Sequence, residues 1–374
     1  MNDTPITTER LNTASSMQVG IATLSSPRSL NALSLDMVRL LDQQLRQWQA
    51  DPQIALVVLK GEGERAFCAG GDIRRLYDSI RALPAGARNP EAEYFFSEEY
   101  RLDYLLHTYT KPVLIWATGV VMGGGMGLLA GASHRIVTET SRLAMPEIGI
   151  GLFPDVGGSW FLNRLPPGMG CFLGMTGAPL NAADALYAGL ADYYLGNSQF
   201  ATLMESLVAS EFDIDAAYNH RMLSHIMREL GRQSPELPES PLRQHEDLIR
   251  HAGRGDSAVE VISNILALDS TSPWIQQAIS TLKTGSPITA SLVFEQLRRG
   301  RHRSLAECFN MEFIMAVRCC QFGDLAEGVR ARLVDKDQQP HWQHQHAGMI
   351  DMDTYFLWPA HWGQQPVVIP PEKN

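Results

Sequence analysis

Residues 113–159 read VLIWATGVVMGGGMGLLAGASHRIVTETSRLAMPEIGIGLFPDVGGS. The first five of them, 113–117, form an apolar run short enough to be a buried strand. A glycine-rich turn at 123–127 and a helix of small residues follow, and a second apolar run then predicts another strand. Two acidic residues, Glu147 and Asp155, lie near the end in loops rich in glycine and proline. The order strand, glycine turn, helix, strand predicts an α/β fold.

The glycine turn has a physical use. Three consecutive glycines, Gly123 to Gly125, remove every Cβ where the strand leads into the helix. The backbone there can approach a ligand closely and can take positive φ. The first N–H groups of the helix lack partners within it, and the positive end of the helix dipole lies behind them. The turn can therefore hold a developing negative charge, or its glycines can serve only to let the helix pack close to the strand.

A second glycine turn occurs earlier in the chain. A strand predicted at residues 55–60 is followed by AFCAGGDI at 66–73, in which Asp72 suits the N-cap of the next helix. Two such turns, each offering a backbone N–H, can form an oxyanion hole with two donors. A phosphate-binding P-loop is disfavoured, because Met126 and Gly127 stand where it needs Lys and then Ser or Thr. Neither turn has the sequence context of a dinucleotide-binding fingerprint.

The two turns and the loops after them resemble the crotonase (enoyl-CoA hydratase/isomerase) superfamily. Within it, the chain is most similar to the 3-hydroxyisobutyryl-CoA hydrolase branch of valine breakdown. The resemblance rests on residues 66–73, 122–127, 145–159 and 327–337. It implies a crotonase-like spiral of repeated ββα units over residues 1–200. It also implies a C-terminal helical region, residues 201–374, that covers the site and forms contacts.

The resemblance also implies roles for particular residues. The oxyanion donors are expected to be the N–H groups of Gly71 and Gly124. Glu147 is expected either to attack the thioester carbonyl or to activate a water, and both mechanisms stay open. Asp155 and Glu99 are candidates to hold the acyl hydroxyl, and Asp155 is a candidate for proton transfer as well.

Two bland alternatives stand beside these roles. Glu147 could be a carboxylate at a helix start after a proline, and Glu99 could be a solvated acid on a helix face. Hydratases of the superfamily divide the addition of water between two glutamates, but this chain has Gly127 at the first of the two positions. That departure favours hydrolysis, which needs a single carboxylate.

Coenzyme A binding is implied for four positions: Arg28, Leu30, Ala69 and Gly71. Arg28 could instead be an ordinary surface arginine. Coenzyme A is expected to be part of the substrate, so neither a separate cofactor nor a metal is expected.

The expected function is hydrolysis of a short hydroxyacyl-CoA, with 3-hydroxyisobutyryl-CoA preferred. One alternative is an enoyl-CoA hydratase or isomerase that acts on a short acyl-CoA. Another is a CoA-ester-binding protein without turnover. These readings differ in whether thiol is released and whether a double bond is hydrated.

Composition limits the partners. A formal net charge of −10 over 374 residues argues against a nucleic-acid surface. The five cysteines lack metal-binding spacing and are expected to be reduced thiols. With neither a signal peptide nor an apolar run of about 18 residues, we expect a soluble, cytoplasmic protein that binds an acyl-CoA, not a membrane. The C-terminal helices are expected to allow a homo-oligomer.

Overall fold

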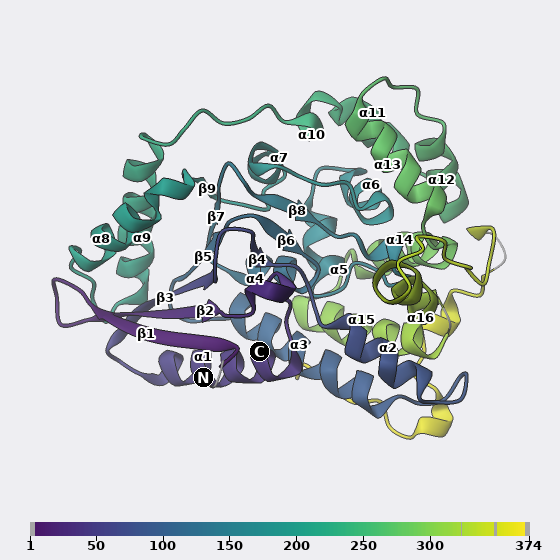
Figure 1. Ribbon diagram of the computed structural model, residues 1–374, viewed down its shortest axis with the longest axis horizontal. Helices are drawn as coiled ribbons and strands as arrows, with labels where there is room; N and C mark the ends of the chain where they lie inside the picture. Colours follow the sequence, from purple (N-terminus) through teal and green to yellow (C-terminus); the bar gives the residue numbers. More distant parts are fainter. Residues whose placement is uncertain (1–3, 323, 348–349, 371–374) are drawn as a thin grey trace. The chain divides into compact units, whose positions relative to one another are not determined.

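The structure is a computed structural model that describes residues 4–322, 324–347 and 350–370 (Figure 1). The chain forms two compact units, each made of three separate parts of the sequence. Unit 1 comprises Met1–Gly71, Leu105–Leu143 and Leu180–Leu242, and unit 2 comprises Asp72–Tyr104, Ala144–Pro179 and Arg243–Asn374. These units do not follow the division predicted at residue 200. That division separates the strand-containing part of the chain from the helical part, and as a domain boundary it stays a prediction.

The strands, in chain order, are β1 (Ile6–Asn12), β2 (Gln18–Leu24), β3 (Ile54–Gly61), β4 (Ala66–Cys68), β5 (Val113–Ala117), β6 (Val120–Met122), β7 (His134–Val137), β8 (Arg142–Ala144) and β9 (Tyr193–Tyr194). The first helices are α1 (Leu35–Ala50), α2 (Ile73–Arg81), α3 (Pro90–His107), α4 (Gly124–Gly131), α5 (Gly158–Phe161), α6 (Met169–Thr176), α7 (Ala182–Tyr187), α8 (Phe200–Val208) and α9 (Ala216–Gly231). The later helices are α10 (Pro241–Gln244), α11 (Glu246–Ala252), α12 (Ala258–Leu266), α13 (Pro273–Thr284), α14 (Pro287–Gly300), α15 (Leu305–Gln321), α16 (Asp324–Val329) and α17 (Asp353–Phe356). Short turns that bear on the site are the 3-10 turns η1 (Pro27–Ser29) and η2 (Glu147–Gly149) and the π-helical turn η5 (Arg330–Val334).

The strands form two sheets, and the order of strands confirms the predicted fold class. The larger sheet has the order β1-β2-β3-β5-β7-β9, and the smaller has the order β4-β6-β8. β1 pairs with β2 in antiparallel fashion, whereas the pairs β2–β3, β3–β5, β5–β7 and β7–β9 are parallel. Successive strand pairs, β3 with β4 and β5 with β6, each send their first strand to the larger sheet and their second to the smaller. A helix follows each of these pairs, which is the expected ββα repeat.

The core of unit 1 explains why the larger sheet carries helices on both faces. Val19 and Ile21 of β2 belong to one buried apolar cluster with residues of β3, β5, β7, α8 and α9. Side chains alternate along a strand, so Gly20 faces the opposite side. A Cβ on Gly20 would lie 2.9 Å from the Trp48 ring, so a glycine leaves room for this indole of α1. Figure 1 shows α8 and α9 beside the strands and α1 along β1 and β2.

Asp72 occupies the N-cap position of α2, as predicted, although its side chain makes no capping hydrogen bond. A second local prediction needs correction. The glycine turn after β6 is shorter than predicted: only Gly123 precedes the helix, because α4 already begins at Gly124. Its N-cap, Gly123, has φ 49° and ψ −121°, which is a backbone conformation open essentially to glycine.

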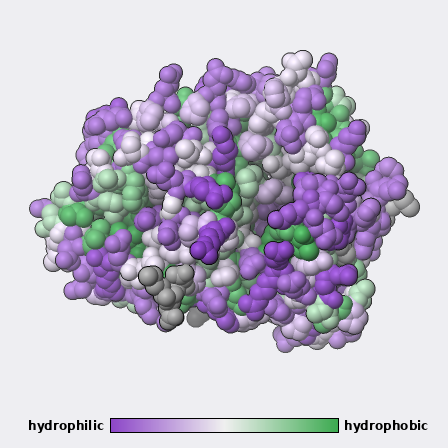
Figure 2. Space-filling view, in the orientation of Figure 1, coloured by the Kyte–Doolittle hydropathy of each residue, from purple (hydrophilic) through white to green (hydrophobic). Residues whose placement is uncertain are grey.

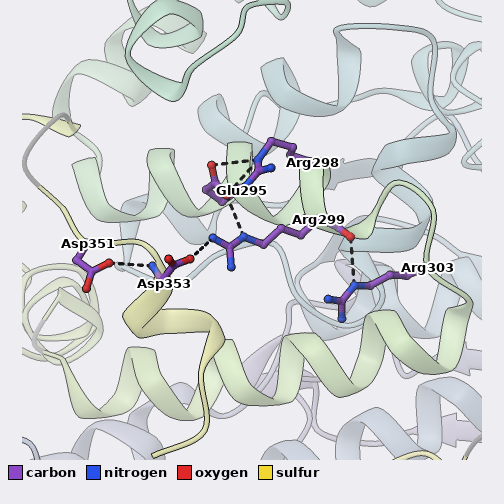
Figure 3. Close-up of polar contacts among 6 residues, drawn as sticks. All are labelled: Glu295, Arg298, Arg299, Arg303, Asp351 and Asp353. Carbon is purple, nitrogen blue, oxygen red and sulfur yellow. Dashed lines mark hydrogen bonds and ion pairs between the residues drawn. The ribbon is translucent and has the colours of Figure 1, made fainter.

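Unit 2 is helical around the loops that follow β8. Its last described segment, residues 350–370, contains α17, and we call it the C-terminal segment. Arg299 of α14 binds Asp353 of α17 at 2.5 Å and Glu295 at 2.9 Å, as Figure 3 shows. Arg318 of α15 also donates through Nε to the carbonyl of Thr354 at 2.7 Å. These bonds hold α17 to both helices.

The visible face of the surface is mostly polar (Figure 2). On the face shown in Figure 2 most atoms are hydrophilic, and the hydrophobic ones are scattered in several small groups. Over the described residues, we find no helix that is both long enough and apolar enough to span a bilayer.

Candidate active site

Glu147 begins the η2 turn in unit 2. Its carbonyl accepts the N–H of Ile150 at 2.9 Å and the N–H of Leu152 at 3.2 Å, which closes the turn. The N–H of Ser286 donates to the carbonyl of Ile148 at 3.0 Å and ties η2 to the start of α14. The Glu147 side chain is buried, and its Oε2 finds no hydrogen-bond partner among the described residues. A carboxyl that acts as a nucleophile or as a general base must be fixed in position and must keep one oxygen available.

Asp155 lies in the loop between η2 and α5, where the backbone is strained. Val156 has φ 51° and Gly157 has φ 91°. A positive φ is costly for a β-branched residue and persists only when the surroundings enforce it. Glu312 of α15 supplies that constraint: its carboxyl accepts the N–H of Gly157 at 2.8 Å and the N–H of Ser159 at 2.7 Å. Glu312 is itself fully buried.

Helix α3 brings three further polar side chains to this part of unit 2. Tyr100 donates its hydroxyl to Oδ2 of Asp155 at 2.9 Å. Glu99 and Asp103 lie four residues apart and therefore share one side of the helix. Both are buried, and within the described residues Oε1 of Glu99 and both carboxyl oxygens of Asp103 have no hydrogen-bond partner.

The buried carboxyl groups influence one another's ionisation. Burial raises the pKa of Asp155 to about 7 and the pKa of Glu312 to about 8. Burial, and then the charge of Asp155, raise the pKa of Glu99 well above its usual range. The same two causes raise the pKa of Glu147, with a smaller contribution from Glu99. Burial and the charges of Glu99, Asp155 and Glu312 raise the pKa of Asp103. Glu99, Glu147 and Asp155 therefore belong to one set of buried carboxyls whose pKa values are all raised.

The two glycine turns are neighbours within unit 1. A Cβ on Gly70, where φ is 112°, would lie 3.9 Å from the nitrogen of Gly124. Gly124 is the first residue of α4, so its N–H has no acceptor within the helix. In the described parts of the chain, no backbone hydrogen bond outside the regular elements uses the N–H of Gly71 or of Gly124. Their predicted convergence with Glu147 on one carbonyl stays a prediction.

The residues expected to bind coenzyme A also lie in unit 1. Arg28 is exposed in η1. Leu30 has φ 55°, and its carbonyl accepts the N–H of Ala69 at 3.0 Å. Leu33 donates its N–H to the carbonyl of Gly70 at 2.7 Å, so the loop after η1 lies against the first glycine turn. Their role in binding stays a prediction.

The segment at residues 327–337 is organised by an arginine. Arg330 pairs with Glu327 at 2.8 Å, with Asp335 at 2.7 Å and with Asp337 at 2.6 Å. Lys336 has φ 58° between those two aspartates. Arg330 therefore fixes the loop that carries Lys336.

Three polar residues of this region were not predicted from the sequence: Tyr100, Asp103 and Glu312. The spacing of four residues from Glu99 on a helix was a signal that could have indicated Asp103. Nothing local marks Glu312, because the two N–H groups that it accepts lie more than 150 residues earlier in the chain.

A spiral of ββα repeats with two adjacent glycine turns defines a crotonase-type protein. The family model described as "Enoyl-CoA hydratase/isomerase" matches residues 19–355, and the chain belongs to this family. Among curated proteins, the chain is 38% identical over 325 residues to the 3-hydroxyisobutyryl-CoA hydrolase, mitochondrial, of Xenopus tropicalis, covering 86% of this chain and 81% of that protein. The human protein of that name is 36% identical over 328 residues, covering 87% of this chain and 81% of its own length.

Solved structures give the same fold. An enoyl-CoA hydratase from Rhodobacter sphaeroides superposes with a TM-score of 0.79 at 33% identity, over 94% of this chain and 96% of that one. A carnitinyl-CoA dehydratase from Mycobacterium thermoresistibile superposes with a TM-score of 0.83 at 31% identity, over 95% and 97% of the two chains.

The relatives overturn one prediction. The sequence was expected to belong to a cytoplasmic protein, but the Xenopus tropicalis and human hydrolases are both named as mitochondrial proteins. The prediction of a cytoplasmic location is therefore wrong. The expected lack of a signal peptide and of a long apolar run was not a sound basis for it.

Proposed function

We propose that this chain hydrolyses the thioester 3-hydroxyisobutyryl-CoA to 3-hydroxyisobutyrate and CoA, as a step of valine breakdown. The observation that carries the proposal is Glu147, a buried carboxyl that keeps one oxygen available. The chain has Gly127 where the two-glutamate hydratase mechanism would need its other acid. The names of the relatives, at 36% and 38% identity over most of their length, support the choice of substrate.

In the proposed reaction the N–H groups of Gly71 and Gly124 stabilise the oxyanion that forms on the thioester carbonyl. Glu147 either attacks that carbonyl or takes a proton from the water that attacks it. By both routes the C–S bond breaks, one water is consumed, and a carboxylic acid and the CoA thiol form. The thiolate leaves with a proton, which a protonated carboxyl of the buried set can supply.

Glu99 and Asp155 are proposed to hold the hydroxyl of the acyl group. A site built to hydrogen-bond a hydroxyl rejects an analogue without it, because the buried polar groups are then left unpaired. We therefore expect isobutyryl-CoA, which lacks that hydroxyl, to be a much poorer substrate.

Coenzyme A binding is proposed for Arg28, Leu30, Ala69 and Gly71. The reaction as proposed needs neither a metal nor a separate cofactor, because water, a carboxylate and backbone donors complete it. A homo-oligomer stays a prediction, which sedimentation of the purified chain would test.

The second candidate is an enoyl-CoA hydratase or isomerase, and the names of the two solved structures favour it. A hydratase would convert crotonyl-CoA with loss of absorbance and without thiol release. A third candidate, a CoA-ester-binding protein, would bind both compounds and convert neither.

The deciding experiment measures thiol release from 3-hydroxyisobutyryl-CoA by the wild-type chain and by Glu147→Gln. We expect release by the wild type and a loss of at least about 100-fold in kcat for the variant, which is typical for a missing acid–base group. Glu295→Gln is the matched control, because its carboxyl pairs with Arg298 and Arg299. Full thiol release by Glu147→Gln would remove Glu147 from the mechanism.

A further inference from the structure

The loop that carries Asp155 is held by buried side chains from three helices. Gln296 of α14 donates through Nε2 to the carbonyl of Pro154 at 2.5 Å. Glu312 of α15 accepts the two N–H groups just after Asp155, and Tyr100 of α3 donates to the carboxyl itself. All three supporting side chains are buried.

We propose that Tyr100 and Glu312 are positioning residues that fix the Asp155 carboxyl for thioester hydrolysis, an inference that rests on the proposed function. Glu312 holds the backbone on the C-terminal side of Asp155, including the left-handed Val156. Tyr100 binds one oxygen of the carboxyl and thereby sets its rotation. Backbone and side chain are thus fixed by different helices.

The burial of Glu312 indicates that its carboxyl does more than fill space in the core. A buried carboxyl costs free energy unless hydrogen bonds compensate it, and an apolar side chain of similar volume would pack at lower cost. Both carboxyl oxygens of Glu312 accept hydrogen bonds from N–H groups of a single strained turn. Its position in the interior of α15 therefore serves that turn.

Among the described residues, burial and also the charge of Asp155 raise the pKa of several other acidic groups. These are Glu99, Tyr100 and Asp103 from α3, Glu147 from η2, and Glu312, Cys319 and Cys320 from α15. Among these, the Tyr100 hydroxyl favours the ionised carboxylate, because it donates a hydrogen bond to it. Loss of that hydroxyl raises the pKa of Asp155.

The direction of the effect does not depend on the form in which Asp155 works. An ionised Asp155 that accepts from the substrate gives a rate that rises with pH through its pKa. A protonated Asp155 that donates gives a rate that falls through the same pKa. In both cases Tyr100→Phe moves that limb of the profile to higher pH.

The first test is the pH profile of thiol release from 3-hydroxyisobutyryl-CoA by wild type and Tyr100→Phe. We expect the limb near pH 7 to move up by roughly one to two units, as for a lost hydrogen bond to a charged group. Tyr109→Phe is the matched control: it removes a hydroxyl that donates to the carbonyl of Leu45 at 2.6 Å. If this limb of the pH profile does not move in Tyr100→Phe, the proposed role of Tyr100 is wrong.

The second test is Glu312→Gln, which has one acceptor oxygen for two N–H donors. We expect kcat/KM to fall by up to about 100-fold, since small misplacements of a group at the site have effects of this size. Glu295→Gln should stay within twofold of wild type. A Glu312→Gln protein with wild-type kcat/KM overturns the role of Glu312.

A readout without turnover separates this inference from the proposed function. Tyr100→Phe should destabilise the chain more at pH 8 than at pH 5, because the hydroxyl donates to the ionised carboxylate, and this difference should vanish in an Asp155→Asn background. A difference that persists without Asp155 overturns the pairing. If the wild-type chain releases no thiol, the proposed function is rejected, and with it the role of Tyr100 and Glu312 in hydrolysis. The unfolding measurements still decide whether Tyr100 pairs with Asp155.

Discussion

Gly125, in the first turn of α4, shows how a single missing side chain allows a helix to pack against a strand. A Cβ at this position would lie 2.3 Å from the carbonyl oxygen of Cys68 in β4. The obstacle is backbone, so it cannot rotate away. For Gly125, the glycine therefore serves the close packing of the helix on the strand, which was the structural alternative for the glycine run. The N–H of Gly124 in the same turn keeps its proposed role as an oxyanion donor.

We predict that Gly125→Ala lowers the free energy of unfolding by about 1–3 kcal/mol, the usual cost of forcing an extra group into a packed site. Gly231→Ala is the control with opposite sign, because its Cβ would meet nothing nearer than 4.0 Å and would improve helix propensity at the end of α9. Urea unfolding measures the change in the free energy of unfolding for both variants. A Gly125→Ala protein as stable as Gly231→Ala would contradict the contact.

Some site residues could be predicted from the sequence and others could not. Glu147 and Asp155 lie in a short motif with proline and glycine neighbours, and a motif can be matched without a fold. Glu312 has no such neighbours, and its function depends on a turn brought to it by the packing of α15. Local sequence predicts residues whose partners are local, and it does not predict partners assembled from distant helices.

At the scale of elements, the same distinction separates the strands. The apolar runs of β3, β5 and β7 were predicted, because they are buried in the interior of the larger sheet. The strands β4, β6 and β8 have three residues each, which is too short for a periodic pattern. Their pairing, such as Ala66 with Val120, joins distant parts of the chain. β1 was also missed, since four of its central residues are exposed and polar.

The C-terminal segment offers an element-scale prediction. Asn310 of α15 accepts the N–H of Val368 at 2.9 Å and of Ile369 at 3.1 Å, and it donates to the carbonyl of Ile369 at 2.8 Å. We predict that Asn310→Ala speeds amide hydrogen exchange in residues 364–370 by roughly tenfold or more, because three hydrogen bonds are lost together.

Asp353→Asn is the comparison for that experiment. The ion pair of Asp353 with Arg299 in Figure 3 is largely exposed, since 67% of the Asp353 side chain is accessible. Exposed pairs contribute about 0–1 kcal/mol, so exchange in the same residues should change little. If Asp353→Asn loosened the segment more than Asn310→Ala did, the proposed anchoring through Asn310 would be wrong.

At the scale of the whole molecule, the buried carboxyls should set the pH dependence of stability. Burial raises the pKa of Asp155 from 3.8 to about 7 and the pKa of Glu312 from 4.5 to about 8. The folded chain therefore binds more protons than the unfolded chain between these values. Stability must fall as pH rises through this window, opposite to the behaviour of an ordinary paired carboxylate.

We predict that the chain is more stable at pH 5 than at pH 8, by a few kcal/mol, because each such group contributes up to about 1.4 kcal/mol per pH unit. Below about pH 4.5 the trend should reverse, since hydrogen bonds from Arg330 lower the pKa of Glu327 and of Asp337, and protonation then breaks these pairs. Calorimetric melting from pH 4 to 8.5 measures the curve. Asp155→Asn should raise the melting temperature at pH 8 and leave it nearly unchanged at pH 5, where Asp155 is already neutral. A melting temperature that climbs steadily from pH 5 to 8 in the wild type would mean that these carboxyls ionise freely, and the set of protonated acids assigned to the reaction could not exist.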